Sequence, residues 1–232
     1  MASAPPGMTT IALNCLEITF LRKHRLISGA RIFDLGAHQC VVAAVLASIA
    51  GPEGKVVAVE ANSHNASIGR RNRELNNLMQ LTILEAAVAE KAGTLIFNEG
   101  LNGQVDDGTG SWGRKKVRAL TIDDLTCEHG APDVVFCDVE GFECFALRGA
   151  ETTLALEADW FIEVHVGVGL EKFGGSVDDV VSFFPTSKFD LFMASDRQPE
   201  PQPFSHGSEL TASRFFLTAI CRGTANTGAA NG

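Results

Sequence analysis

Strand-like and helix-like segments alternate along most of this chain, and this alternation restricts its fold more than any other feature. The strand-like segments are short and apolar, and they cover residues 31–35, 55–60, 81–84, 134–137 and 160–166. The helix-like segments cover residues 41–50, 63–77, 141–156 and 176–184. Parallel strands need crossover helices, and when they are buried on both faces they form continuous apolar runs. The sequence therefore predicts an α/β fold with a mostly parallel sheet covered by helices on both faces.

The two ends of this pattern differ from its middle. Residues 9–28 carry apolar side chains at helical spacing, with basic residues late in the segment, which predicts an N-terminal helix. The last two strand-like segments, 189–194 and 215–221, are joined by a proline-containing stretch, 196–213, that has no helical spacing. We therefore expect these two strands to pair as a C-terminal antiparallel hairpin.

An accessory pair of strands is expected at 94–97 and 116–120, on either side of the glycine-rich loop 98–113. A structureless loop of this length is typical of a functional lid or of disorder. We expect one domain over residues 1–222, with an N-terminal helix (1–28), a core (29–222) and then a disordered tail (223–232).

Composition restricts the partners and the compartment. The formal net charge is -9, which argues against nucleic acid or an anionic membrane as the main partner. The apolar run 11–21 is too short to cross a bilayer. Six cysteines occur without a Cys-x-x-Cys pair, and several lie in apolar runs, so we expect free thiols and a cytoplasmic protein. A small-molecule partner is the better expectation.

Three acidic residues follow the strand-like segment 134–137, namely Asp138, Glu140 and Glu143. In open α/β sheets, ligands bind at the carboxyl ends of the strands, so Asp138 is expected to face a ligand. Glu140 and Glu143 fall at the start of the next predicted helix, where an acid stabilises the helix by about 0.3–1 kcal/mol. For Glu143 this helix-start role and a functional role both stay open, and Glu140 is the stronger functional candidate.

A second group of acids points to a nucleoside. Asp34 and Gly36 stand where the first strand passes into the first helix, and Glu60 ends the second strand. A dinucleotide site would need Gly-x-Gly-x-x-Gly here, and the Asp34 carboxylate would repel its pyrophosphate. An acid at the Glu60 position typically accepts hydrogen bonds from ribose hydroxyls. The pattern favours a nucleoside with a cationic amine or sulfonium, and S-adenosylmethionine carries both.

Five short motifs occur in a fixed order along the chain. They are Phe-Asp-Leu-Gly-Ala (33–37), Val-Ala-Val-Glu-Ala-Asn (57–62), Glu-Ala-Ala-Val (85–88), Leu-Thr-Ile-Asp-Asp-Leu (120–125) and Asp-Val-Glu-Gly-Phe-Glu (138–143). In these motifs the chain resembles the FkbM family of S-adenosylmethionine-dependent methyltransferases, from residue 31 to about residue 195. The resemblance implies a Rossmann-like class I methyltransferase fold and methyl transfer to oxygen in small molecules or glycans.

The resemblance also implies which residues bind the cofactor. The methionine end of the cofactor would contact Asp34, Gly36, Ala37 and His38. The ribose would contact Glu60, with Ala61 and Asn62 at its near edge, and the adenine would contact Ala87 and Val88. The chain departs from the family at two places. His38, Gln39 and Cys40 stand where the family's loop usually ends in Asn-Ile-Gly, and Ala61 replaces a common proline.

Methyl transfer requires a nucleophilic oxygen held about 3 Å from the methyl carbon and a base that takes its proton. Asp138 could accept this proton or hold the cofactor's ammonium group. Glu163 and His165 alternate along a strand, so they face the same way and form a second candidate for proton handling. The candidate catalytic residues are therefore Asp138, His165 and Glu140, with either Asp138 or His165 as the base.

Two further hypotheses stay open, one about a metal site and one about acceptor binding. Asp138, Glu140, Glu163 and His165 could bind a metal, but their spacing fixes no coordination geometry, and none is expected. Trp112 with the basic residues 114–116, and His206, lie in loops that could bind the acceptor, although solvated loop residues are the simpler expectation.

Two other functions compete with a methyltransferase. A nucleotide-dependent oxidoreductase could use a similar sheet, but no Gly-x-Gly-x-x-Gly follows the first strand. A non-catalytic cofactor-binding module would explain the altered loop at Gln39 and Cys40.

Overall fold

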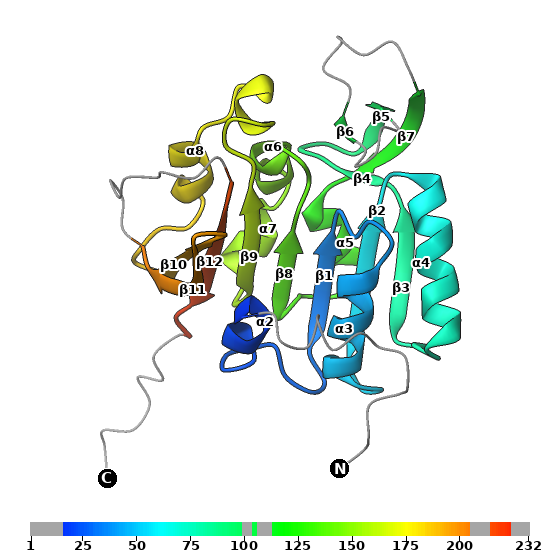
Figure 1. Cartoon of the computed structure of the whole chain (residues 1–232), viewed down its shortest axis with the longest axis horizontal. Coiled ribbons are helices and arrows are strands. Elements are labelled where there is room, and N and C mark those ends of the chain that lie inside the picture. Colours follow the sequence, from blue (N-terminus) through cyan, green and yellow to red (C-terminus); the bar gives the residue numbers. More distant parts are fainter. Residues whose placement is uncertain (1–15, 99–103, 106–112, 205–213, 224–232) are drawn as a thin grey trace.

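The computed structural model describes residues 16–98, 104–105, 113–204 and 214–223. An eight-stranded sheet forms its centre, with the strand order β11-β10-β12-β9-β8-β1-β2-β3 (Figure 1). The strands are β1 (Arg31–Leu35), β2 (Lys55–Glu60), β3 (Leu81–Glu85), β8 (Val134–Cys137), β9 (Asp159–Val164), β10 (Phe189–Ser195), β11 (Gln198–Pro203) and β12 (Phe215–Cys221).

The direction of the strands confirms the predicted fold class. Strands β3, β2, β1, β8 and β9 are parallel, whereas β12 runs antiparallel to β9 and to β10. The chain leaves β1 toward β2 and β3 and later returns to the other side of β1 as β8. This reversal places a topological switch point between β1 and β8, where open α/β sheets bind ligands.

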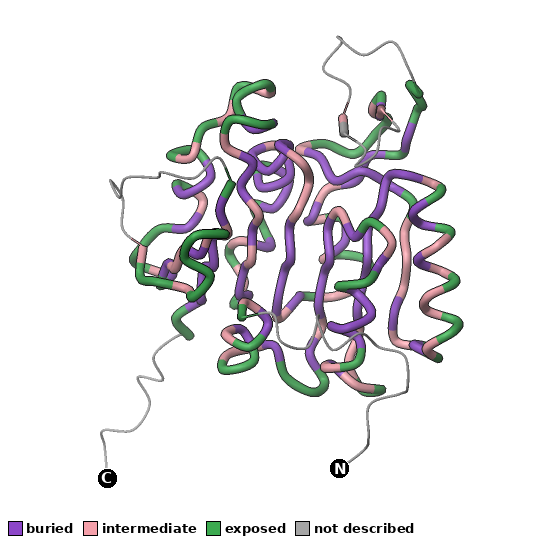
Figure 2. The backbone as a smooth tube through the Cα atoms, viewed as in Figure 1, coloured by how far each residue is buried: buried purple, intermediate pink, exposed green. Residues whose placement is uncertain are grey.

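Helices cover both faces of the sheet, as the alternation of segments predicts. One face packs against α2 (Leu16–Leu21) and α3 (Val41–Ala50), and α4 (Ser63–Leu75) contacts α3 and β3. The other face packs against α5 (Ile122–His129), α6 (Glu143–Arg148), α7 (Glu151–Ala155) and α8 (Val177–Ser182). The strands between these layers are largely buried (Figure 2). Among the described residues, no helix has both the length and the apolar character needed to cross a membrane.

A second, four-stranded sheet lies above the first in Figure 1. Its strand order is β4-β7-β5-β6, with β4 (Ala87–Val88), β5 (Gly93–Asn98), β6 (Gln104–Val105) and β7 (Arg114–Leu120). Strands β5 and β7 pair antiparallel, so the expected accessory pair is confirmed. Most of the glycine-rich loop, including Trp112, lies outside the described residues, as do His206, residues 1–15 and the tail from residue 224.

Some helix and strand predictions were wrong. The strand predicted at 160–166 covers Asp159–Val164, so His165 lies just beyond its end. The predicted helix 9–28 ends at Leu21, because Arg25 turns away to bind Asp159. The predicted helix 141–156 is interrupted after Arg148, where Gly149 packs so tightly on the Ala89 carbonyl that a side chain there would overlap it.

Besides the short strands β4 and β6, three elements were not predicted. Helix α5 begins with a capping box, in which the Thr121 and Asp124 side chains bond each other's backbone N–H. A short 3-10 helix, η1, covers Leu170–Phe173. Strand β11 forms within the proline-containing stretch and pairs with β10 at the sheet edge. Prolines are tolerated on an edge strand because one side of it needs no backbone donors.

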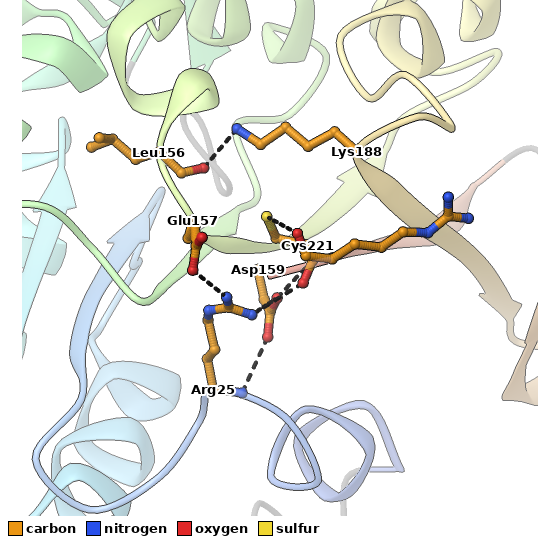
Figure 3. A network of polar contacts seen from close by, with 7 residues as sticks. Arg25, Leu156, Glu157, Asp159, Lys188 and Cys221 are labelled. Carbon is orange, nitrogen blue, oxygen red and sulfur yellow. Dashed lines mark hydrogen bonds and ion pairs between the residues drawn. The ribbon is translucent and has the colours of Figure 1, made fainter. Parts of the chain in front are cut away.

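A buried ion pair joins the N-terminal segment to two strands (Figure 3). Asp159, at the start of β9, is fully buried. Its Oδ1 accepts hydrogen bonds from the Cys221 N–H at 3.0 Å and from Arg25 Nη1 at 3.4 Å, and its Oδ2 accepts one from the Arg25 N–H at 3.1 Å. Arg25 also contacts the half-exposed Glu157 at 3.1 Å. The carboxylate therefore ties three distant parts of the chain together.

We expect Asp159→Ala to lower the free energy of unfolding by about 3 kcal/mol, because it leaves Arg25 and the Cys221 N–H without their buried acceptor. The matched control, Glu157→Gln, removes the exposed partner of the same arginine and should change stability by no more than about 0.5 kcal/mol. Urea unfolding of both variants tests this. Equal losses would show that the buried carboxylate has no special role.

Candidate active site

A cavity of about 290 Å³ lies at the switch point of the central sheet. Its walls come from the ends of β1 and β2, from β3–β4, from the small sheet and from the β8–α6 loop. The lining residues are Gly36, His38, Val59, Glu60, Ala61, Ala86, Ala87, Val88, Phe97, Val105, Asp138, Val139, Glu140 and Phe142.

Gly36 joins the strand ends beneath this cavity. Its φ is +83°, and a side chain at this position would overlap the carbonyl oxygen of Asp138. Its N–H donates to the Val59 carbonyl at 2.9 Å, and the Asp138 N–H donates to the Leu35 carbonyl at 2.9 Å. The glycine lines the cavity, but the close approach that requires it is to the protein's own backbone.

Glu60 organises the two loops next to it. Its Oε2 accepts the His38 N–H and its Oε1 the Asn62 N–H, both at 2.7 Å. Burial raises the pKa of this carboxyl group, and the two backbone hydrogen bonds oppose that rise. The side chain is 5% exposed and lines the cavity. Asn62 does not line it: its Oδ1 caps α4 by accepting the N–H groups of His64 and Asn65.

Asp34 faces α3 and does not line the cavity. Burial, and then the charge of Glu60, raise its pKa to about 7, while a hydrogen bond from the Ala43 backbone acts in the opposite direction. Its Oδ2 is buried without a hydrogen-bond partner among the described residues. Ala37 and His165 also lie outside the lining, whereas the other predicted cofactor and catalytic residues form part of it.

Cys40 adopts a left-handed conformation with φ +58° and is fully buried. Its side chain packs against Gly69 in α4, where an added methyl group would overlap the Cys40 sulfur. Burial raises the pKa of the thiol to about 12, so Cys40 is a packing residue. Gly69 in α4 therefore leaves room for the cysteine that departs from the family's usual glycine at position 40.

Four acids surround one buried histidine beside the cavity. His165 follows β9 and is 4% exposed. Its Nδ1 lies 2.7 Å from Oε1 of Glu143. Its Nε2 lies 3.4 Å from Glu140, 3.6 Å from Glu163 and 3.7 Å from Asp138, in each case measured to a carboxylate oxygen. The predicted candidates Asp138, Glu140, Glu163 and His165 therefore meet.

The proton affinities in this cluster depend on each other. Burial raises the pKa of Asp138 to about 8, with further increases from the charges of Glu163 and Glu140 and an opposing effect of His165. Burial alone would lower the pKa of His165, but the hydrogen bond to Glu143 and the surrounding acids raise it to about 9. Burial also raises the pKa of Glu163, which Arg214 opposes from 2.9 Å.

Glu143 lies in the first turn of α6 but differs from an ordinary helix-start acid. It is fully buried, and its Oε1 lies at hydrogen-bond distance from both His165 Nδ1 and the Gly141 N–H. Its place in the first turn of a helix gives no signal for this contact, because an acid there is usually exposed. The apolar wall formed by Phe97 and Phe142 was also missed, since the two aromatic residues lie far apart in the chain.

The walls of the cavity suit S-adenosylmethionine. Alanine, valine and phenylalanine side chains on one side offer an apolar surface to a base, and Glu60, Asp138 and Glu140 offer acceptors to hydroxyls and cations. Oδ1 of Asp138 is buried without a hydrogen-bond partner among the described residues. The ligand atoms of Asp138, Glu163 and His165 lie within 4.8 Å of one another, so these side chains could also hold a divalent cation.

The packing of Cys40 on Gly69 gives a testable coupling. We expect Gly69→Ala to lower the free energy of unfolding by about 1–3 kcal/mol through overpacking, although alanine favours a helix elsewhere. In the Cys40→Gly background the same substitution should be neutral or stabilising, because the overlapping sulfur is gone. A double-mutant cycle by thermal or urea unfolding measures this, and additive effects would contradict it.

Comparisons with known proteins agree with the fold and the motifs. A family model described as the methyltransferase FkbM domain matches residues 34–191. A search of the curated proteins finds no significant match.

Three solved structures are similar in fold. The FkbM methyltransferase of Methylobacillus flagellatus KT has a TM-score of 0.52 at 15% identity, over 82% of this chain and 43% of that one. An S-adenosylmethionine-dependent methyltransferase of Aquifex aeolicus has 0.51 at 13% identity, over 94% and 98%. An rRNA methylase of Streptococcus thermophilus has 0.52 at 10% identity, over 88% and 93%. At these identities the similarity shows a shared Rossmann-like class I fold. With the family model matching most of its length, the chain belongs to the FkbM methyltransferase family.

Proposed function

We propose that this protein transfers the methyl group of S-adenosylmethionine to a hydroxyl oxygen of a small secondary metabolite or a carbohydrate. One observation carries the proposal. Asp138 lines the cavity, and its Oδ1 lies 3.7 Å from Nε2 of the buried His165. A carboxylate at this position can accept the proton of a hydroxyl group in the cavity.

The acceptor oxygen would attack the methyl carbon in line with the carbon–sulfur bond, whose electron pair stays on sulfur. The chain's part is to hold the acceptor and to take its proton. Asp138 takes the proton, and a pKa raised to about 8 by burial suits a base working near neutral pH. Glu140 lines the same cavity and would bind the acceptor. His165 lies behind Asp138 and acts through it.

We assign the cofactor to the cavity in the orientation that the family motifs imply. Glu60 and Ala61 would face the ribose, and Ala87 and Val88 the adenine. Gly36, His38 and Asp138 would face the methionine end. Asp34, Ala37 and Asn62 do not line the cavity, so we expect them to act by shaping the loops around it.

The charge of the site favours a neutral or cationic acceptor. Asp138 and Glu140 line the cavity, Glu163 lies next to them, and the chain as a whole is acidic. Phosphates would be repelled by these carboxylates, which argues for a metabolite or glycan over RNA. The described cysteines, at positions 40, 127, 137, 144 and 221, are free, which supports a reducing compartment such as the cytoplasm.

The two competing functions have less support. A dinucleotide-dependent oxidoreductase would place a pyrophosphate beside Asp34 and Glu60, where their carboxylates oppose it. A non-catalytic module with a decayed loop is disfavoured by the matched packing of Cys40 on Gly69 and by the intact bond between His38 and Glu60.

Calorimetry tests cofactor binding. We expect S-adenosylmethionine and S-adenosylhomocysteine to bind, and Glu60→Gln to weaken both by about tenfold through the loss of a charge-assisted hydrogen bond. Glu85→Gln is a matched control, since Glu85 ends the neighbouring strand in register with Glu60 but forms an exposed pair with Arg70. Absence of binding at millimolar ligand, or tight binding of NADH, would overturn the assignment.

Turnover tests the base. With a panel of hydroxylated acceptors, formation of S-adenosylhomocysteine should rise with pH through about 8, since Asp138 accepts a proton only when it is ionised. Asp138→Asn should lower the rate at least 100-fold with the cofactor still bound, while Asp196→Asn, at an exposed position, should not. A fully active Asp138→Asn variant would refute this role.

Chelation tests the metal alternative. We expect EDTA to leave turnover unchanged, because Arg214 already pairs with Glu163 at 2.9 Å. Loss of activity that Mg²⁺ or Mn²⁺ restores would instead assign Asp138, Glu163 and His165 as ligands.

A further inference from the structure

We propose that Glu143 is a positioning residue for the proton-accepting unit: its buried carboxylate fixes His165 behind Asp138 with the Nδ1–H directed away from the cavity. This inference rests on the proposed function, since it assigns Asp138 and His165 to the handling of the acceptor's proton. Glu143 lies in the motif 138–143, but the resemblance to the family assigns it no role.

The contacts of Glu143 set the tautomer of His165. Oε1 of Glu143 accepts the Gly141 N–H at 2.8 Å and lies 2.7 Å from Nδ1 of His165. Since the carboxylate oxygen can only accept, Nδ1 carries a proton, and Nε2 is the nitrogen that faces the acids beside the cavity. A carboxylate that orients an imidazole in this way fixes which nitrogen exchanges protons.

Glu143 also holds two walls of the site together. Gly141, which donates to it, packs so closely on Gly169 that a side chain at Gly141 would overlap the Gly169 backbone. Gly169 in turn donates its N–H to the His165 carbonyl at 3.1 Å. Glu140 precedes Gly141 and has a left-handed φ of +51°, a strained conformation that persists only when its surroundings enforce it. Glu143 therefore links the β8–α6 loop to the end of β9.

The charge of Glu143 acts on the same proton. The groups facing His165 are Glu143 from α6, Asp138 and Glu140 from the β8–α6 loop, and Glu163 from β9, which is paired with Arg214. Hydrogen bonding to Glu143 is the largest effect that raises the pKa of His165. Oδ1 of Asp138 lies 3.7 Å from Nε2 of His165, so the two form a unit in which the proton affinity of each depends on the charge of the other. Removing a negative charge beside this unit lowers its affinity for protons.

The decisive variant is Glu143→Gln. Its amide oxygen can still accept from Gly141 and from His165 Nδ1, so the substitution removes the charge and keeps the geometry. Glu151→Gln is the matched control, because Glu151 is an exposed acid in the first turn of the next helix. If Glu143 only stabilised its helix, the two variants would behave alike.

The measurement is ¹⁵N nuclear magnetic resonance of the histidine rings, with His165 assigned by comparison with His165→Gln. We expect the pKa of His165 to fall by at least about one unit in Glu143→Gln and to stay unchanged in Glu151→Gln. The acid limb of the pH–rate profile should move to lower pH, and the plateau rate should fall because the base is weaker. An unchanged His165 pKa, or a lower rate with an unchanged profile, would overturn the proposal.

A second measurement does not depend on how well the variant folds. In the wild-type protein, neutral His165 should carry its proton on Nδ1, and a signal from the Nε2–H tautomer would overturn the inference. These spectra need neither cofactor nor acceptor. Failure of S-adenosylmethionine to bind would therefore refute the proposed function while leaving the role of Glu143 in the His165 titration to be judged separately.

Discussion

The contact between Gly36 and the backbone of Asp138 is the constraint on which the rest of the site depends. Gly36 has no side chain and a positive φ, so β1 and β8 can meet at their carboxyl ends. That meeting closes the floor of the cavity and sets Asp138 on its wall. The switch point of an α/β sheet becomes a binding site because neighbouring strands end here and their connections diverge. In this protein a single missing Cβ allows the two ends to come close enough.

Burying acids beside such a cavity costs free energy unless their charges find partners, and the chain provides them unequally. The Glu60 carboxylate accepts hydrogen bonds from two backbone N–H groups. The Asp159 carboxylate accepts them from the backbone N–H groups of Arg25 and Cys221 and from the Arg25 side chain. The acids around His165 share one imidazole and one arginine, and burial raises the pKa of Asp138 and Glu163. Fixed backbone donors thus oppose the rise in pKa at Glu60 and Asp159, whereas Asp138 has His165 as the neighbour that opposes its rise.

Periodicity made the central sheet predictable, including its parallel strands and its antiparallel C-terminal pair, because apolar strands and helices of ordinary length have strong local patterns. The errors lie where distant contacts decide. Helix α2 ends early because Arg25 binds Asp159, and the helix predicted at 141–156 breaks where Gly149 meets Ala89. The proline-containing stretch became a strand only because a sheet edge was available to it.

Taken by itself, the sequence determined the fold class, the family, and the acids that stand at strand ends, since these follow from local pattern and motif order. Only the tertiary structure decided what each acid does. It turned Asp34 toward α3, gave Glu60 two loops to hold, and buried Glu143 against His165. Position along a strand tells that a side chain reaches the end of a sheet. Which partner it meets depends on segments that are far apart in the chain, and a local sequence pattern cannot show which of these segments come together.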